Sequence, residues 1–528
     1  MKLTFVSIED SITAIGFRKM AAIARQIHPE TQVSYIVPTG KRAFLKLIFR
    51  KDASEPTMSN DDIKNIGDYL AGFDMVCFSS MTPFADITKQ IIATIRAINS
   101  KTYVVWGGVH PILYPDDAIQ FSNAICVGEG EFAFKNFLYA YEKDHDYTAT
   151  KNFWFNINGN IIRNAFLPLL TSEEMEKCPS PLYASDELIY KKGRGFMPLS
   201  TSEYLLFNDI TYTTVWTIGC PFKCTFCHNS KLIKMDRNYA KLRHPSVDYK
   251  IKEIKSVLEK HPYISLVKFY DDSFIALPSN VLTEFADKWK TEINLPFWIF
   301  GMIPVYMKRD KMKYLVWAGM SRAKMGIQSG SDKILKFYKR FDRPGLNAKS
   351  ISIMSEFSKF MLAPIYDIIV DNPIETKDDI VATLQMFYDS PRPYRLYIHS
   401  LRILPDSEME RDFAALNIFP EDIGSILGNV KPTLANAMFH LLSVFKPPKW
   451  LFSLVIKHIR PYERTPRASI FFNIAYYLYK ARLFLDRIIA MDFSVLLGKF
   501  GWILWKLGIV GFIQRRRMKK AYSGIMLN

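Results

Sequence analysis

The feature that most constrains the fold of this chain is an alternation of short apolar runs with amphipathic helical stretches. In residues 1–145 the apolar runs have the length and composition of strands, and helical patterns such as 18–27 and 87–98 separate them. This alternation predicts an α/β fold with a doubly wound parallel sheet. The predicted strands are residues 3–7, 32–37, 73–79, 102–106 and 124–127.

A second alternating series lies between residues 206 and 410. Six strand–helix units predict a partial parallel barrel, (β/α)6, in which the chemistry gathers at the carboxyl ends of the strands. The predicted strands are 213–217, 266–270, 297–300, 323–327, 365–370 and 395–400, and the predicted helices between them include 247–259, 279–290, 331–338 and 377–387.

The length of 528 residues exceeds what one core usually supports, so we expect two or three domains. Residues 146–205 contain several prolines and glycines and an Asn158-Gly159 pair typical of a hairpin turn, and we interpret them as a linker. Helical patterns take over after about residue 411. The expected order is a doubly wound domain (1–145), a linker (146–205), a partial barrel (206–410) and a helical, basic C-terminal region (411–528).

Candidate binding residues follow the predicted strands of the first domain. Ligands of doubly wound sheets bind beyond the carboxyl ends of the strands, and glycine there lets the backbone approach a ligand closely. Taken alone the signal is weak, because a glycine after a strand is more often only a turn. The candidates are Ser79, Ser80, Gly107, Gly108, His110, Gly128, Glu129, Gly130 and Glu131.

Three of the six cysteines lie in one loop after the first strand of the second series. The spacing of Cys220, Cys224 and Cys227 lets the loop turn three sulfurs toward one point, and thiolates gathered in this way bind soft metals or iron–sulfur clusters. Three protein ligands leave one position open to an outside ligand.

The cysteine loop fits two other sites as well. Residues 224–228 form a C-x-x-C-H string, which can mark attachment of a c-type haem, but that assembly takes place outside the cytoplasm and the first residues do not read as an export signal. A zinc site with His228 as its fourth ligand suits the ligand types. Adjacent residues rarely reach the same ion, so an iron–sulfur cluster is the preferred interpretation.

The loop resembles the signature of the radical SAM superfamily, a C-x3-C-x2-C loop with an aromatic residue, here Phe226, before the last cysteine. The resemblance implies that Cys220, Cys224 and Cys227 hold a [4Fe–4S] cluster whose open iron binds S-adenosylmethionine. It further implies cleavage to a 5′-deoxyadenosyl radical, with an electron from a donor such as flavodoxin or ferredoxin.

The same resemblance suggests further contacts with S-adenosylmethionine. The Phe226 region would pack near the adenine, and Asp272 would bind the methionine ammonium, for which a carboxylate is the expected partner. Gln328 and Ser329 would contact the ribose or the carboxylate. From the residues alone, Asp271 and Asp272 could equally cap the segment that follows them.

The first domain resembles the cobalamin-binding domain that precedes the radical SAM domain in the B12-dependent branch of that superfamily. A G-G-x-H loop at residues 107–110 and a G-E-G-E loop at residues 128–131 carry the resemblance. It implies that the strand-end residues named above bind cobalamin. The sequence contains no D-x-H-x-x-G string, so the lower face of cobalt would not be ligated by the histidine of that motif. The alternative is a Rossmann-like domain without the cofactor.

The net charge of +17 is concentrated near the C-terminus, because residues 441–528 hold 16 Lys and Arg against 3 Asp and Glu. The basic residues are interleaved with bulky aliphatic side chains, which argues against a nucleic-acid partner.

An apolar run over residues 493–513 is interrupted by Lys499 and Lys506, which with Asp492 would form one narrow polar stripe on a helix. Two tryptophans lie beside the stripe. Such a helix predicts peripheral contact with an anionic membrane surface, whereas full spanning is disfavoured because each mid-span lysine costs about 2.5–3.5 kcal/mol. The alternative is a helix buried against the barrel.

The resemblance to the B12-dependent branch implies an enzyme that methylates a carbon, and the apolar, basic tail suggests a hydrophobic small molecule or lipid as its substrate. Oxidative ring closure, another rearrangement, or tRNA methylthiolation are the enzymatic alternatives, and a membrane-surface binding protein with a structural zinc is the alternative from another class. Cys77, Cys126 and Cys178 stand apart as inert thiols, which indicates a reducing compartment. We therefore expect a cytoplasmic protein, peripheral to the membrane if the tail binds lipid.

Overall fold

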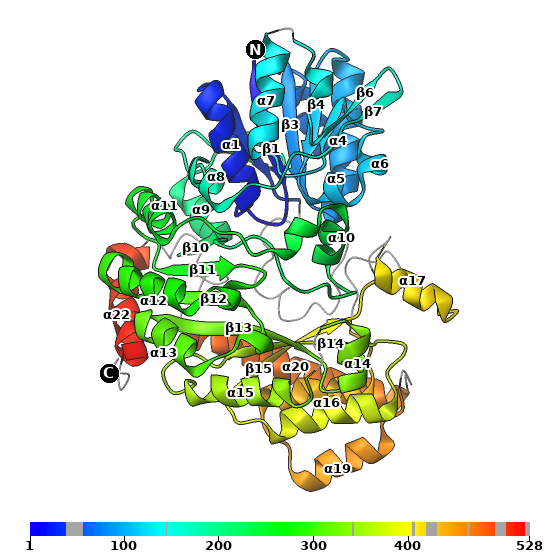
Figure 1. Ribbon diagram of the computed structural model, residues 1–528, viewed down its shortest axis with the longest axis vertical. Helices are drawn as coiled ribbons and strands as arrows, with labels where there is room; N and C mark the ends of the chain where they lie inside the picture. Colours follow the sequence, from blue (N-terminus) through cyan, green and yellow to red (C-terminus); the bar gives the residue numbers. More distant parts are fainter. Residues whose placement is uncertain are drawn as a thin grey trace.

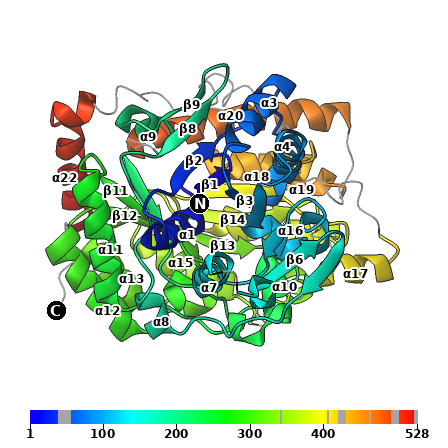
Figure 2. The same ribbon diagram turned by 90° about the horizontal axis from the view of Figure 1, so that it is seen from above.

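The computed structural model describes residues 1–38, 56–143, 145–208, 210–340, 343–403, 407–418, 430–461, 465–490 and 503–522. Two sheets organise the described chain, and each belongs to its own α/β domain (Figure 1). Seen from above, the first domain lies over the second (Figure 2).

The first sheet has nine strands in the order β7-β6-β5-β4-β3-β1-β2-β8-β9. The six strands from β5 to β8 in this order are all parallel: β5 pairs with β4, β4 with β3, β3 with β1, β1 with β2, and β2 with β8. This confirms the predicted doubly wound core. The strands are β1 (Leu3–Ile8), β2 (Gln32–Ile36), β3 (Met75–Ser80), β4 (Tyr103–Gly107), β5 (Ala124–Cys126), β6 (Phe153–Ile157), β7 (Asn160–Arg163), β8 (Leu188–Lys191) and β9 (Gly195–Pro198).

Helices cover both faces of this sheet, because successive residues of its central strands point to opposite sides. Phe5 packs with Phe17 of α1 and Phe134 of α7 on one side. Val6 belongs to the cluster on the other side, which includes residues of α3 and α4. The helices of this domain are α1 (Ile15–Ile27), α3 (Asn60–Leu70), α4 (Ala85–Ile98), α5 (Val109–Leu113), α6 (Pro115–Ala118) and α7 (Glu131–Glu142).

Residues 146–205 are not an irregular linker, which corrects the sequence interpretation. The Asn158-Gly159 pair does turn a hairpin, and that hairpin, β6–β7, extends the first sheet beyond β5, while β8 and β9 extend it beyond β2. These strands are short and broken by glycine and proline, so the local pattern is weak. Burial of Phe153 and Phe155 in the core stabilises them. Two short helices, α8 (Ser172–Glu176) and α9 (Thr201–Asn208), complete the segment.

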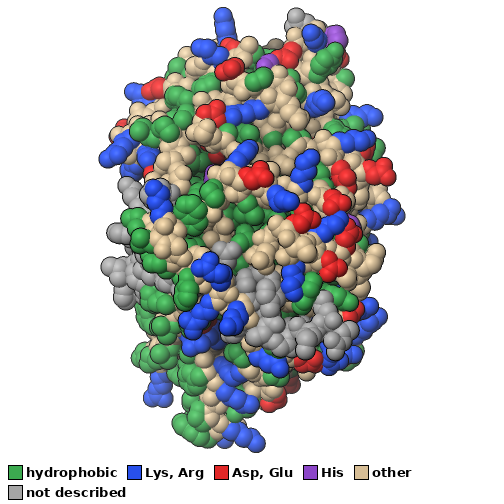
Figure 3. Space-filling model, turned by 90° about the vertical axis from the view of Figure 1, so that its left-hand side faces the viewer, with side chains coloured by type: hydrophobic (Ala, Val, Ile, Leu, Met, Phe, Trp, Pro, Cys, Tyr) green, Lys and Arg blue, Asp and Glu red, His purple; other side chains and the backbone are tan. Residues whose placement is uncertain are grey.

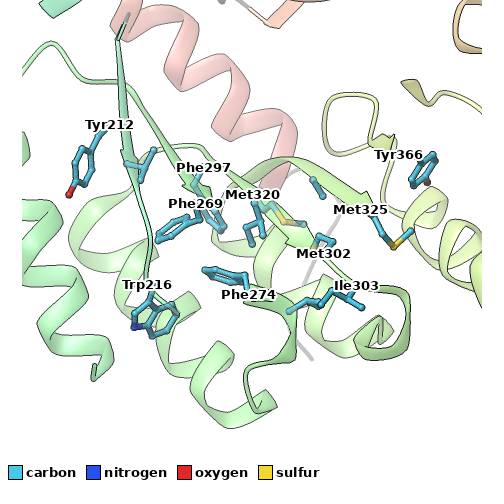
Figure 4. Close-up of a cluster of buried hydrophobic side chains, with 14 of the residues drawn as sticks. Tyr212, Trp216, Phe269, Phe274, Phe297, Met302, Ile303, Met320, Met325 and Tyr366 are labelled. Atoms are coloured by element: carbon cyan, nitrogen blue, oxygen red, sulfur yellow. The ribbon is translucent and has the colours of Figure 1, made fainter. Parts of the chain in front are cut away.

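The second sheet has six parallel strands in chain order, β10 to β15, which confirms the partial barrel. Its outer face packs aromatic side chains such as Phe269 and Phe297 against Phe285 and Trp289. Phe269 and Phe297 lie beside Phe274 in this part of the core (Figure 4). The elements are β10 (Thr211–Thr214), α10 (His228–Met235), α11 (Val247–Lys260), β11 (Leu266–Tyr270), α12 (Ser279–Lys288), β12 (Phe297–Met302), α13 (Arg309–Ala318), β13 (Met320–Gln328), α14 (Asp332–Phe337), α15 (Leu346–Glu356), β14 (Ile365–Val370), α16 (Lys377–Asp389) and β15 (Arg395–Ser400).

The C-terminal region is helical, as predicted, and packs against the end of the barrel. Helix α20 lies against α18, its Tyr479 hydroxyl donates to the Leu396 carbonyl oxygen over 3.0 Å, and its Asp486 pairs with Arg395. The helices are α17 (Glu408–Ala415), α18 (Leu434–Val444), α19 (Lys449–His458), α20 (Pro466–Ala490) and α22 (Ile509–Tyr522).

Only part of the predicted helix at 493–513 falls within the described residues, since Asp492, Lys499 and Trp502 lie outside them. In the described part, Gly508 adopts φ 73° and separates a short helical turn from α22. Trp505 packs against the main core and α22 contacts α13 and β13. In the part of the chain that the structure describes, every helix is too short or too polar to cross a membrane.

Candidate active site

The three cysteines lie on a loop between β10 and α10. The backbone at the start of this loop is held by the extended segment that follows α10. Ile218 and Arg243 exchange two backbone hydrogen bonds of 2.8 and 2.9 Å, and the Cys220 amide donates to the Tyr239 carbonyl oxygen over 3.2 Å. Gly219 adopts φ 100°, and a Cβ there would overlap the Lys241 carbonyl oxygen. The close passage of these two segments therefore requires glycine before the first cysteine.

The cysteines are close enough for their charges to interact. Burial raises the pKa of the Cys220 thiol to about 11, and the charge of Cys224 acts in the same sense. Burial, Cys224 and Cys220 likewise raise the pKa of Cys227 to about 12. Cys224 is buried and the other two cysteines are half-buried. Three neighbouring thiolates would repel one another without a cation, so a bound metal centre would favour their deprotonation. Phe226 lies half-buried between the last two cysteines, with its ring edge-on to Tyr338.

The two aspartates after β11 have different environments. Asp271 is buried, its Oδ1 accepts hydrogen bonds from the backbone amides of Trp216 (3.1 Å) and Thr217, and burial raises its pKa to about 6. Asp271 therefore fixes the backbone of the two residues that lead into the cysteine loop. Asp272 is reached by solvent, yet burial in the surrounding protein raises its pKa, while the Asn229 side chain and His228 oppose the shift. Its charge also raises the pKa of Cys220 and Cys227, so Asp272 lies near the cysteine site.

Gln328 and Ser329 end β13 in contrasting ways. Gln328 adopts φ 70°, and its side chain occupies the space left by the missing Cβ of Gly326. Ser329 is fully buried, its hydroxyl lies 3.1 Å from Thr383 Oγ1 of α16, and it accepts from the Ser331 amide over 3.1 Å. The placement of Ser329 favours a structural role over the predicted cofactor contact, whereas Gln328 lies beside the cysteine site through its neighbour Arg340.

Arg340 joins the end of β13 to the cysteine loop. Its Nη2 donates to the Gly326 carbonyl oxygen over 2.8 Å, and its Nη1 donates to Cys224 Sγ over 3.5 Å. A guanidinium that donates to a ligand sulfur stabilises negative charge there and so influences any metal centre that the sulfur binds. No sequence motif singles out this residue.

The face of the second sheet opposite to its helices carries a group of polar and aromatic side chains, one from each of the strands β11 to β15. Asp367 Oδ2 lies 3.1 Å from Lys324 Nζ, and its Oδ1 lies 3.2 Å from His399 Nε2. Tyr270 is 53% exposed and lies edge-on to Phe300 with ring centroids 4.6 Å apart. We call Tyr270, Phe300, Lys324, Asp367 and His399 the inner-face group.

The strand ends of the first domain form a tight junction at the G-G-x-H loop. Gly108 adopts φ 92°, and a Cβ there would lie 2.9 Å from Ser79 Oγ and from the Ser80 backbone. Ser80 is buried and accepts a 2.9 Å hydrogen bond from Trp106 Nε1. Ser79 and Gly107 are only partly buried, so a ligand approaching this edge would meet them first.

His110 is buried between two rings and is already engaged on one side. It stacks between Trp106 and Tyr114, and its Nε2 lies 2.9 Å from Asp117 Oδ2. Burial lowers its pKa, with the Asp117 contact opposing the shift. Its Nδ1 has no hydrogen-bond partner among the described residues, which leaves one buried polar atom for a ligand to satisfy.

Glu129 of the G-E-G-E loop contacts Arg243, which lies beside the cysteine loop. Arg243 donates to both Glu129 carboxylate oxygens, over 2.7 and 3.2 Å, and to the Leu170 carbonyl oxygen over 2.7 Å. Because the Arg243 backbone also pairs with Ile218, this ion pair ties the first domain to the cysteine loop. Gly128 lies close enough to Asn152 that a Cβ would clash at 2.8 Å, Gly130 packs beside Met20, and Glu131 begins α7 with a pKa raised by burial.

A second contact joins the same two regions. Lys231 of α10 donates to the Leu113 carbonyl oxygen, and its Nζ lies 5.2 Å from the centroid of the Tyr114 ring. The predicted ligand edges of both sheets therefore face each other across α10, which lies between the two domains in Figure 1.

Comparison with known proteins identifies the second domain. Residues 214–387, which include the cysteine loop and β11 to β14, match the family model described as the radical SAM superfamily. This stretch is a radical SAM domain.

Other comparisons cover more of the chain than this family model does. The uncharacterized methyltransferase PH0819 of Pyrococcus horikoshii is 25% identical over 316 residues, which cover 59% of this chain and 63% of that protein. The chain thus matches less than two thirds of that relative's length. The structure of the radical S-adenosylmethionine methyltransferase TsrM from Kitasatospora setae, with cobalamin and a [4Fe–4S] cluster bound, has a TM-score of 0.60 at 15% identity and covers 79% of this chain and 75% of that chain.

The cobalamin-dependent S-adenosylmethionine radical enzyme OxsB with aqua-cobalamin bound also has a TM-score of 0.60, at 14% identity, and covers 99% of this chain and 84% of that chain. At such identities the similarity concerns the fold. The chain has the fold of cobalamin-dependent radical SAM enzymes, with the radical SAM domain below a doubly wound domain and a helical C-terminal region.

Within the described residues, no group of three or more His, Cys, Asp and Glu side chains is arranged to hold a single metal ion. The three cysteines are among the residues covered by this finding, so it does not separate a zinc site from a cluster site. Sequence reasoning did not find Arg243, Lys231 and Arg340 around the radical SAM domain, because their partners lie 114, 118 and 116 residues away in the sequence.

Proposed function

We propose that this chain is a cobalamin-dependent radical SAM methyltransferase that methylates a carbon atom of a hydrophobic small molecule or lipid. The single observation that carries the proposal is the hydrogen-bonded link from Glu129 through Arg243 to Ile218. It holds the strand ends suited to cobalamin opposite the cysteine loop suited to a cluster. The similarity to TsrM and PH0819, both named methyltransferases, supports the reaction type.

The residues of the cysteine loop fit a [4Fe–4S] cluster with one open iron, which S-adenosylmethionine would occupy. When bound, the cluster and S-adenosylmethionine supply a 5′-deoxyadenosyl radical and cobalamin supplies the methyl group. Cys220, Cys224 and Cys227 would ligate the cluster, Arg340 would stabilise charge on Cys224, and Asp272 would offer a carboxylate to the methionine ammonium. Reduction requires an electron donor such as flavodoxin or ferredoxin, and we place the enzyme in the cytoplasm.

The first domain offers partly exposed Ser79 and Gly107 and the unsatisfied Nδ1 of His110 to cobalamin. The ring stack and the Asp117 contact keep His110 beside the sheet. These features support a cofactor held by backbone and hydroxyl contacts at the strand ends.

The inner-face group supports the substrate class. The Tyr270 and Phe300 rings present apolar surface, while Lys324 and His399 present donors held by Asp367. A substrate with an apolar body and an acidic or hydrogen-bond-accepting end fits this combination.

The test is anaerobic incubation of reduced protein with S-adenosylmethionine carrying a deuterated methyl group and with cell lipid extract, followed by mass spectrometry. We expect one lipid or hydrophobic metabolite to gain one labelled methyl group, and expect no gain with Cys224→Ala. A product that instead lacks two hydrogens, or consumption of S-adenosylmethionine with no labelled product in any fraction, would contradict methylation.

A further inference from the structure

Helix α20 is apolar on two opposite faces. Its inner face packs into the core through Ala468, Phe472, Ala475 and Tyr479. The opposite side presents a second row of large apolar residues. Ile470, Ile474 and Ile489 are 62%, 56% and 58% exposed, and Tyr477, Leu478 and Leu485 lie between them at 40–48%. We call these six residues the outer face of α20.

The outer face lies on one side of the helix. Ile470, Ile474, Tyr477 and Leu478 follow one another within about two turns, and Leu485 and Ile489 continue the row on the far side of Arg482. From Ile470 to Ile489 the row extends about 28 Å at the ordinary helical rise. Single exposed apolar residues are normal on a protein surface, but a group of large ones on one side of a helix marks a site of interaction.

The C-terminal region to which this face belongs is basic. Among the described residues from 430 onward, Asp486 is the only acidic one, and its side chain is buried beside Arg395. Exposed cations occur throughout the same region, at Lys446, Lys449, Lys457, Arg460, Arg467, Lys506, Arg515, Arg516 and Lys519. Figure 3 shows hydrophobic and basic side chains next to one another over the lower part of the molecule, where the C-terminal helices lie in Figure 1.

We propose that the outer face of α20 docks on a membrane surface that contains anionic lipids, with its apolar side chains in the headgroup boundary and the cations of the same region on lipid phosphates. An apolar helix face with basic flanks is the combination that binds such an interface. A second copy of this chain is a poorer occupant, because pairing this face with itself would bring two basic surfaces together. The inference deepens the proposed function, since it gives a lipid substrate a route to the enzyme, but its test does not depend on catalysis.

The experiment is co-sedimentation of the full chain, purified anaerobically, with vesicles of phosphatidylcholine alone or of phosphatidylcholine with phosphatidylglycerol. We expect binding to the anionic vesicles that weakens as salt is raised. The variant Ile470→Asp/Ile474→Asp should lower the partition coefficient roughly tenfold or more, because burial of one isoleucine contributes about tenfold in affinity.

The matched control is Ile98→Asp/Tyr139→Asp, which changes two residues of the first domain that are 50% and 58% exposed. It adds the same charge at similar exposure, so its partition coefficient should stay at the wild-type value. Gel filtration and the cluster absorbance establish that both variants fold.

Absence of wild-type binding to anionic vesicles, or equal loss in both variants, would overturn the proposal. Sedimentation equilibrium without lipid supplies the other decisive outcome, because a wild-type dimer that Ile470→Asp/Ile474→Asp dissociates would assign the face to a second copy. Cleavage of S-adenosylmethionine without vesicles is measured in parallel. A wild-type chain that cleaves S-adenosylmethionine but does not bind anionic vesicles would refute the docking surface alone. A wild-type chain that binds the vesicles but does not cleave S-adenosylmethionine would refute the radical chemistry alone.

Discussion

Replacement of Arg243 by glutamine should weaken the junction between the two domains more than any loss of a surface ion pair. The Glu129 and Arg243 side chains are 15% and 11% exposed, and the arginine makes two hydrogen bonds to the carboxylate and one to the Leu170 carbonyl oxygen. Removal of one partner of a buried pair costs 3–5 kcal/mol, and the residual exposure places this pair near the lower end, at about 3 kcal/mol.

A double-mutant cycle separates the pair from its neighbours. Glu129→Gln and Arg243→Gln together should cost about 2 kcal/mol less than the sum of the single changes, because the second change no longer strands a buried charge. Urea titration of the anaerobically purified chain, followed by tryptophan fluorescence, provides the four free energies of unfolding.

The matched control is Arg163→Gln, which breaks a 2.8 Å pair with Asp116 whose side chains are 51% and 73% exposed. It should cost less than about 1 kcal/mol. Additive penalties in the cycle, or an Arg243→Gln penalty no larger than that of the control, would refute the role of this ion pair in joining the domains.

Three further changes test other parts of the site and fold. Arg340→Gln removes a donor to Cys224 Sγ, so it should lower the reduction potential of the cluster, because the donor stabilises the added negative charge. A redox titration followed by electron paramagnetic resonance measures this potential, and Arg340→Lys should give a value between the two. An unchanged potential would contradict the contact. Burial, with Asp379 and Asp371, raises the pKa of Glu375 to about 8, so the folded chain keeps a proton that the unfolded chain loses. The free energy of unfolding should therefore fall as pH rises from about 5 to about 8, and Glu375→Gln should reduce that fall by on the order of 3 kcal/mol; an equal slope in urea titrations of both proteins would refute it. Gly301→Ala should lower the free energy of unfolding by much more than the roughly 1 kcal/mol expected for Gly193→Ala. Both glycines have positive φ, but only at Gly301 would the added Cβ overlap the Asp271 carbonyl oxygen. Similar penalties for the two variants in thermal unfolding would argue against that overlap.

The sequence predicts the parts of this protein that depend on local pattern. The strands of the barrel carry continuous apolar runs, so their positions agree with β11 to β15 within a few residues. The spacing of Cys220, Cys224 and Cys227 likewise predicts the radical SAM domain, because the chemistry requires those residue types within one loop.

Features that depend on distant contacts could not be predicted in the same way. Strands β6 to β9 carry weak local signals and gain their stability from the edges of the first sheet, so residues 146–205 resembled a linker. Ser329 directly follows β13, a position typical of ligand-binding residues, but its hydroxyl is hydrogen-bonded to Thr383 of α16. The outer face of α20 was equally hidden, because a helix that is apolar on both sides resembles a buried helix until its neighbours are placed.

Electron–nuclear double resonance on the reduced protein with isotope-labelled S-adenosylmethionine is the most direct test of the central claim. The account predicts hyperfine coupling between the cluster and both the labelled amino nitrogen and the labelled carboxylate oxygen, and loss of the cluster signal in Cys224→Ala. A cluster that forms with Cys220, Cys224 and Cys227 intact but couples to neither label would contradict an open iron that binds the cofactor.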